Sequence, residues 1–164
     1  MKNAWLLGLI LVCTSAFGQI KLPSLVSDGM VLQQNQVTQI WGWASPDEKI
    51  RISTRNKSIK TQADKSGKWQ AQLPAFAAGG PFDIRVNELV IHNVLWGEVW
   101  LCSGQSNMEF QLITSKNGEA EVAASNYPNI RLFTVKKTIS HQQQEKLQDG
   151  EWSQCSPATS SNFS

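Results

Sequence analysis

The fold class of this chain is indicated most clearly by residues 37–54, which read VTQIWGWASPDEKIRIST. Residues 37–44 are rich in residue types that favour strands, and residues 45–48 then break the run with turn formers. Residues 50–54 alternate apolar with polar side chains, which is the pattern of a strand with one buried face. The stretch therefore predicts two successive β-strands joined by a turn.

The same rhythm extends outward from this stretch. Further strand patterns cover residues 58–61, 69–73 and 82–86, and turn residues precede each of them. Strands about ten residues apart, with no helical period among them, are typical of an antiparallel β-sandwich. We therefore expect a β-sandwich domain over residues 19–93.

Two tryptophans, Trp41 and Trp43, lie two positions apart and so on one face of their strand. An exposed pair of this kind could stack against a sugar ring. Packing into the core of the sandwich is the interpretation that we favour from sequence alone.

The pattern changes after residue 93. Residues 94–102 (VLWGEVWLC) are nearly continuously apolar, which predicts a strand buried on both faces. Residues 106–112 can begin a helix, residues 119–125 form a second helical candidate, and residues 130–135 resemble another strand. This order is typical of an α/β layer architecture. Since two strands cannot bury their own faces, we expect residues 94–164 to be an incomplete domain.

The first 18 residues resemble a secretory signal peptide. Lys2 supplies a positive charge, residues 4–12 are apolar, and residues 16–18 (AFG) fit the small-x-small rule for cleavage before Gln19. A membrane-spanning helix would need about 20 apolar residues, so a cleaved signal is favoured over an anchor. The expected location is secreted or periplasmic, with no membrane association after cleavage.

If the chain is exported, Cys102 and Cys155, the two cysteines of the mature chain, could form a disulfide, because disulfides persist outside the cytosol. One bridge between them is possible, and two buried thiols are the alternative. Two cysteines without a histidine at ligand spacing do not make a zinc site. No metal or organic cofactor is expected.

Composition narrows the classes of partner. The chain has 164 residues, of which 41% are hydrophobic and 17% charged, as in a globular protein. The formal net charge is +2 and the basic residues are scattered, so a nucleic-acid partner is not expected. The oligomeric state is not indicated.

Ser106, in the run GQSNM of residues 104–108, is the candidate nucleophile. It follows the predicted buried strand, at the edge where open α/β sheets bind ligands, and its N–H would begin a helix and could stabilise an oxyanion. Gly104 would allow a tight turn. Met108 replaces the second glycine of the G-x-S-x-G motif, and spacing alone favours a helix-capping or loop serine.

A longer run strengthens the case for a nucleophile. Residues 97–109 (GEVWLCSGQSNME) closely resemble the nucleophile segment of the sialate O-acetylesterase family, within the SGNH-type hydrolases. Residues 28–33, 40–44, 67–69 and 78–81 resemble the N-terminal β domain of that family. The resemblance covers about residues 22–164, and residues 94–164 would then be the start of an SGNH hydrolase domain.

The resemblance implies an exported enzyme that removes acetyl groups from sialic acids or other glycans. Ser106 would be its nucleophile, and Gly104, Gln105 and Asn107 would support the nucleophile loop and the oxyanion. The expected partner is therefore O-acetylated sialic acid or another acetylated glycan.

The resemblance also implies groups that this sequence lacks. The family's oxyanion-hole glycine and asparagine and its Asp-x-x-His pair lie further along, and no Asp-x-x-His occurs here. His92 and His141 are expected at the surface rather than as bases, and Glu109 is expected in a first helical turn. We therefore expect a fragment of a serine carbohydrate O-acetylesterase that is inactive alone. The alternative is a non-catalytic carbohydrate-binding or structural β-sandwich protein.

Overall fold

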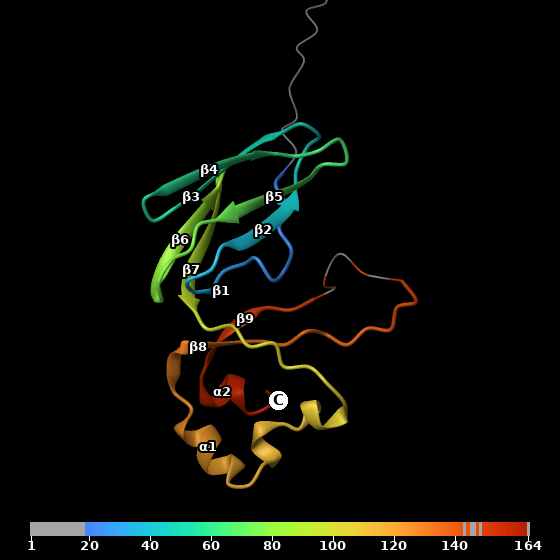
Figure 1. The fold of residues 1–164 in the computed structure, drawn as a ribbon. Helices are drawn as coiled ribbons and strands as arrows, with labels where there is room; N and C mark the ends of the chain where they lie inside the picture. Colours follow the sequence, from blue (N-terminus) through green and yellow to red (C-terminus); the bar gives the residue numbers. More distant parts are fainter. Residues whose placement is uncertain (1–18, 143, 145–146, 148, 164) are drawn as a thin grey trace, which may run out of the picture.

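The computed structural model of the chain describes residues 19–142, 144, 147 and 149–163, and the fold is mostly β (Figure 1). Seven strands precede the nucleophile candidate: β1 Val31–Gln33, β2 Thr38–Trp43, β3 Lys49–Thr54, β4 Lys57–Gln62, β5 Lys68–Leu73, β6 Gly79–Val86 and β7 Leu89–Gly97. After it come the 3₁₀ helices η1 (Ser106–Glu109) and η2 (Leu112–Thr114), then α1 (Gly118–Ala124), β8 (Tyr127–Phe133), β9 (Trp152–Cys155) and α2 (Pro157–Ser160).

The first seven strands form two sheets around one core. The larger sheet has the order β1-β7-β6-β3-β4, in which β1 and β7 are parallel and the other pairs antiparallel; β2 and β5 form a separate antiparallel pair. Ile40 and Leu73 of the smaller sheet are fully buried in one cluster with Ile52 and Ile84 of the larger sheet. The shared core holds the two sheets together by burial of apolar side chains.

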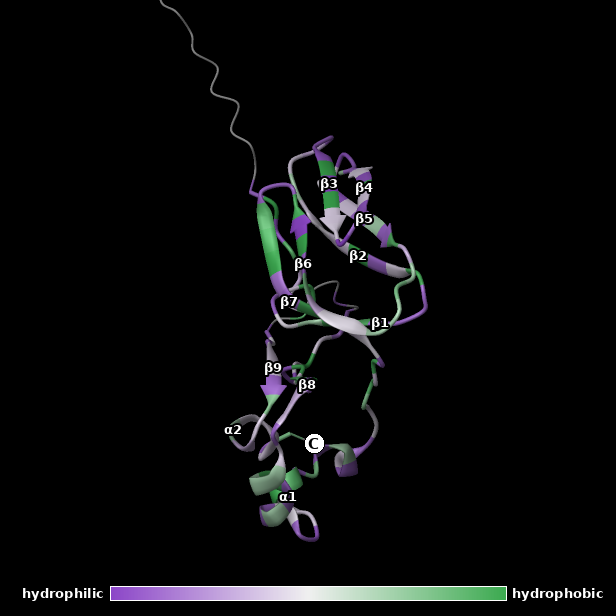
Figure 2. Cartoon of the chain, turned by 90° about the vertical axis from the view of Figure 1, so that its left-hand side faces the viewer, coloured by the Kyte–Doolittle hydropathy of each residue, from purple (hydrophilic) through white to green (hydrophobic). Residues whose placement is uncertain are grey.

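The period-2 pattern of the sequence is visible in this part of the structure. Exposed and buried residues alternate without exception along β5, and Figure 2 shows hydrophobic and hydrophilic residues in turn along the strands. The strands predicted at residues 37–44, 50–54, 58–61, 69–73 and 82–86 appear as β2 to β6.

Strand β7 crosses the expected boundary between residues 93 and 94. Val94 and Trp96 are buried in the core, and Leu95 pairs with Val31 of β1. The first residues of the run at 94–102 therefore belong to the larger sheet, because β1 and β6 offer it backbone partners on both sides.

The second part of the chain lies below the sheets in the view of Figure 1. Its strands β8 and β9 are antiparallel, and α1, α2 and the two 3₁₀ helices lie beside them. The expected α/β layered sheet is not seen among the described residues. The predicted helix at residues 119–125 is present as α1, whereas the predicted strand at 130–135 begins earlier and ends at Phe133.

Hydrogen bonds connect the β8–β9 part to the β domain. The Trp152 indole Nε1–H donates to the Leu25 carbonyl at 2.9 Å, and Arg131 Nη2 donates to Asn93 Oδ1 at 3.1 Å. Within the described ranges no helix is long and apolar enough to cross a membrane. The predicted signal, residues 1–18, lies outside the described residues.

Candidate active-site segment

The segment between β7 and Ser106 is extended and exposed. The strand predicted to run to Cys102 ends at Gly97, and the exposed fractions of Val99, Trp100 and Leu101 are 45%, 83% and 92%. The prediction of a strand buried on both faces is therefore wrong beyond Gly97. The physical reason is that β1 ends opposite Gly97, and no strand among the described residues pairs with residues 98–105.

Ser106 is the first residue of η1 and is exposed. Within the described part of the chain its hydroxyl makes no hydrogen bond. Gln105 precedes it in extended backbone (φ −85°, ψ −172°), and the Gln105 carbonyl accepts the Met108 N–H at 2.9 Å. The turn therefore presents the serine side chain to solvent.

The helix expected over residues 106–112 is instead two short 3₁₀ helices, η1 and η2. A four-residue turn aligns few peptide dipoles, so the expected oxyanion stabilisation by a helix N-terminus has little support here. Asn107 lies inside the turn, where its carbonyl accepts the Phe110 N–H at 3.2 Å.

Gly104 serves a purpose other than the tight turn expected from the sequence. It is absent from the residues with positive φ. A Cβ at this position would come within 2.9 Å of Met108 Cγ, so the glycine makes room for the methionine side chain. Gly104, Gln105, Ser106 and Asn107 thus lie together in one exposed turn.

A hydrogen-bonded cluster fixes the start of this segment to the β sheets. The Glu98 carboxylate accepts hydrogen bonds from Gln33 Nε2 at 3.0 Å and from Gln34 Nε2 at 2.6 Å, and Gln33 Oε1 accepts the Val99 N–H at 2.9 Å. These bonds, from Gln33 first and then from Gln34, lower the pKa of Glu98. We call Gln33, Gln34 and Glu98 the Glu98 clamp.

The clamp was not predicted from the sequence. Its only signal was the pair Gln33 and Gln34 at the end of and just after the 28–33 stretch, and amides that far from residue 98 in sequence do not indicate a contact. The contact exists because β1 lies parallel to the end of β7, which brings Gln33 opposite Gly97.

The chain is similar to known proteins over most of its length. No family model matches the chain. The curated sialate O-acetylesterase of Pongo abelii is 30% identical over 151 residues, which are 81% of this chain and 29% of that protein. Those of Homo sapiens (29% identical) and Mus musculus (28% identical) match over 81% and 89% of this chain.

A solved structure agrees with these sequence matches. The crystal structure of a carbohydrate acetylesterase from Xanthomonas citri superposes with a TM-score of 0.85 at 43% identity, over 88% of this chain and 34% of that one. This chain is a homologue of the sialate O-acetylesterases. The resemblance inferred from the sequence is thus confirmed. The chain spans less than a third of the length of these curated relatives.

In this sialate O-acetylesterase homologue, both histidines lie at the surface, as expected from the sequence. His92 is exposed on β7, where its Nδ1 lies 3.1 Å from Asp83 Oδ2, and His141 is exposed in the polar loop. Glu109 occupies the first turn of η1 and forms an ion pair with Lys137. Neither histidine is paired with Ser106.

The two cysteines do not form the bridge considered from the sequence. Cys102 is exposed in the extended segment, Cys155 is buried at the end of β9, and both are free thiols. The possible bridge is absent from this structure, where the two residues belong to segments that are not paired with each other, and of the alternative of two buried thiols only Cys155 fits. Among the described residues, no three histidine, cysteine, aspartate or glutamate side chains gather where they could hold a metal ion.

Proposed function

We propose that this chain carries the nucleophile segment of an exported carbohydrate O-acetylesterase, with Ser106 as the nucleophile. The observation that carries the proposal is the exposed, unbonded hydroxyl of Ser106 at the start of η1, in a homologue of acetylesterases. Ser106 is not the N-cap of η1, since that position belongs to Gln105, so helix capping does not account for the serine.

The proposed reaction proceeds in two steps. Ser106 Oγ attacks the acetyl carbonyl carbon while a base takes its proton, and the sugar oxygen leaves with that proton to give acetyl-Ser106. Water then attacks the same carbonyl, releases acetate and restores the hydroxyl. Serine is a weak nucleophile at neutral pH without a base, and neither His92 nor His141 supplies one here. The base in this proposal is an Asp-oriented histidine from another segment of the whole enzyme.

The exposed apolar residues Val99, Trp100 and Leu101 support completion of an SGNH-type α/β domain. Exposing a contiguous apolar run to water costs free energy, and such a run marks a surface that another segment of the protein covers. In the proposed whole enzyme, this run pairs with further strands and becomes buried, and the turn at Ser106 then lies at the edge of the completed sheet.

The proposed substrate class follows from the names of the relatives. They are sialate O-acetylesterases and a carbohydrate acetylesterase, so we propose an O-acetylated sialic acid or another acetylated glycan as substrate. Such glycans are met outside the cytosol, which agrees with the signal-like pattern of residues 1–18.

The test uses the protein encoded by the full reading frame that contains this chain. Deacetylation of an aryl acetate and of an O-acetylated sialoside is measured for the parent and for Ser106→Ala. Removing the nucleophile eliminates the covalent route, for which a loss on the order of 10⁶ in kcat is known in a serine hydrolase. The melting temperature is expected to stay unchanged, since the hydroxyl is exposed and unbonded.

Ser103→Ala is the matched control, because Ser103 is exposed in the same segment. It should retain the activity of the parent. If Ser106→Ala still deacetylates within about tenfold of the parent, which is only about 1.4 kcal/mol of barrier, Ser106 is not the nucleophile.

A further inference from the structure

The outward face of the small sheet forms a second candidate site, on the opposite side of β2 and β5 from the core. Along β2 the outward residues are Gln39, Trp41 and Trp43, and across from them on β5 lie Gln70, opposite Trp41, and Lys68, opposite Trp43. The inward residues Ile40, Trp69 and Ala71 are buried, as the period of a strand requires.

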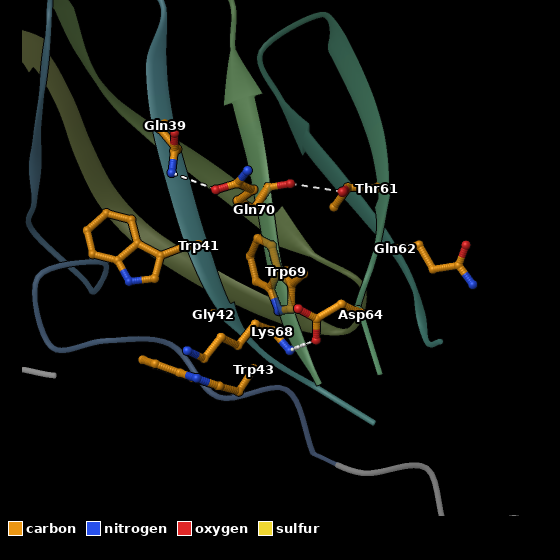
Figure 3. A pocket seen from close by; sticks show the side chains of 10 residues that line it. All are labelled: Gln39, Trp41, Gly42, Trp43, Thr61, Gln62, Asp64, Lys68, Trp69 and Gln70. Atoms are coloured by element: carbon orange, nitrogen blue, oxygen red, sulfur yellow. Dashed lines mark hydrogen bonds between the residues drawn. The ribbon is translucent and has the colours of Figure 1, made fainter. Parts of the chain in front are cut away.

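This face is hollowed into a pocket of about 680 Å³ (Figure 3). Its lining includes Gln39, Trp41, Trp43, Thr61, Lys68 and Gln70. Figure 3 shows the Trp41 indole near the paired amides of Gln39 and Gln70, and the Trp43 indole beside the Lys68 side chain. The pocket thus combines flat aromatic surface with hydrogen-bonding groups.

Core packing covers the side chains of Trp41 and Trp43 only in part. Both are half-buried, and Trp41 also contacts the core cluster, so the packing interpretation holds for it only in part. On the inner side of β2 the space is already filled: a Cβ at Gly42 would lie 2.8 Å from Trp69 Cζ2. Both tryptophans line the pocket on the outward side of the strand.

The polar groups of the pocket have unused capacity. Gln39 Nε2 donates to Gln70 Oε1 at 3.0 Å, which leaves Gln39 Oε1 as an acceptor and Gln70 Nε2 as a donor among the described residues. Thr61 Oγ1 donates to the Gln70 carbonyl at 2.8 Å and keeps its lone pairs for another donor. These are the partners that sugar hydroxyls need.

The charges of the pocket favour an uncharged ligand. Its carboxylate, Asp64, accepts bonds from Ser66 Oγ at 2.7 Å, from Ser66 N at 2.8 Å and from Lys68 N at 3.0 Å. The hydrogen bond from the Ser66 side chain first, and then that from the Lys68 backbone, lower the pKa of Asp64. The carboxylate thus stabilises the turn of residues 64–68 through these hydrogen bonds. Lys68 is the one basic residue of the lining, and apart from Asp64 the other lining residues are neutral, which is weak complementarity for a polyanion.

We propose that the outward face of β2 and β5 binds an uncharged glycan chain, with pyranose rings stacked on Trp41 and Trp43. A pyranose has a face of C–H groups that packs on the electron-rich face of an indole, and a rim of hydroxyls that pairs with Gln39, Thr61 and Gln70. The site is separate from Ser106, so it would hold a polysaccharide near the enzyme rather than take part in deacetylation.

The test titrates the purified chain with cellohexaose, xylohexaose and mannohexaose, which are neutral, and with a heparin hexasaccharide, which is anionic. Binding is followed by calorimetry and by the tryptophan indole N–H resonances. At least one neutral hexaose is expected to bind and to shift the Trp41 and Trp43 resonances. Binding of none of them, or of heparin alone, overturns the proposal.

Variants locate the site. Trp43→Ala and Trp41→Leu are each expected to raise the Kd about tenfold, as loss of one stacking partner predicts. Gln39→Ala should raise the Kd severalfold. Because the Gln39 side chain is exposed, this variant is expected to fold, and it tests the site even if a tryptophan variant does not fold. Gln72→Ala is the matched control, because Gln72 is exposed on the same strand face and does not line the pocket.

Two further outcomes would count against the site: an equal loss in Gln72→Ala, or no loss in any pocket variant. Ser106→Ala is expected to bind the hexaose as the parent does. Failure of glycan binding is thereby distinguished from failure of the proposed esterase function, since each is read from a different variant and a different measurement.

Discussion

Gly42 shows, at the scale of one residue, how closely Trp69 and the Lys21 backbone pack against β2. A Cβ there would lie 2.5 Å from the Lys21 carbonyl oxygen and 2.8 Å from Trp69 Cζ2. The carbonyl belongs to backbone that pairs with Trp43, and the indole is buried, so neither neighbour can move away cheaply. Glycine is required at this position by space rather than by a left-handed backbone.

Gly42→Ala is therefore expected to lower the free energy of unfolding by about 1–3 kcal/mol, the usual cost of overpacking a core. Urea denaturation followed by tryptophan fluorescence measures the change. Gly97→Ala is the control, because a Cβ at position 97 would meet only Val31 Cγ1 at an ordinary 3.6 Å. Equal stability of the Gly42→Ala variant and the parent would show that Trp69 and the Lys21 backbone leave room for a methyl group here.

At the scale of elements, the Glu98 clamp joins β1 to the end of β7 and to the segment that leads to Ser106. Because the two glutamine amides stabilise the carboxylate, the pKa of Glu98 is lower in the folded chain than in the unfolded chain. The stabilisation is present above the unfolded pKa and is lost as pH falls through the lower, folded pKa.

Glu98→Gln should therefore lower the melting temperature slightly at neutral pH, and the difference from the parent should shrink in acid and vanish once the pH falls below the lowered pKa of Glu98 in the folded chain. Thermal unfolding of both proteins across this range measures the effect. Glu88→Gln, which removes an exposed carboxylate outside the clamp, is expected to show no such convergence. A difference between Glu98→Gln and the parent that stays constant with pH would contradict the proposed effect of the clamp.

At the scale of the whole molecule, the chain combines a buried β core with an exposed turn that holds the proposed nucleophile, Ser106. We expect the 164-residue chain alone to show no hydrolysis of an aryl acetate above background, since no Asp-x-x-His motif is present to activate Ser106. The assay compares the purified chain with its Ser106→Ala variant. Activity that this substitution removes would require a base within these residues.

The proposed export of the protein is a second expectation for the whole molecule. We expect the secreted protein to begin at Gln19, because residues 16–18 provide the well-placed small-residue cleavage site. Intact mass and N-terminal sequencing of secreted material test this position. A product that retains Trp5, or that carries a lipid on Cys13, would exclude it.

The sequence by itself determined the local structure of the β sheets. Strand alternation in residues such as Lys68 to Leu73 and the turn residues between strands depend on neighbours in sequence, so β2 to β6 could be predicted. The thirteen-residue run around Ser106 also identified the family, because it is contiguous.

Tertiary structure alone decided what depends on distant partners. Residues 94–102 have one apolar composition throughout, yet Val94 to Gly97 are a strand and Val99 to Leu101 are exposed, because β1 offers hydrogen bonds only as far as Gly97. Likewise, Trp41 and Trp43 could be placed on one face from their spacing. Which face is outward was decided by Ile40, Trp69 and Leu73, whose burial against the larger sheet leaves the two indoles over the pocket.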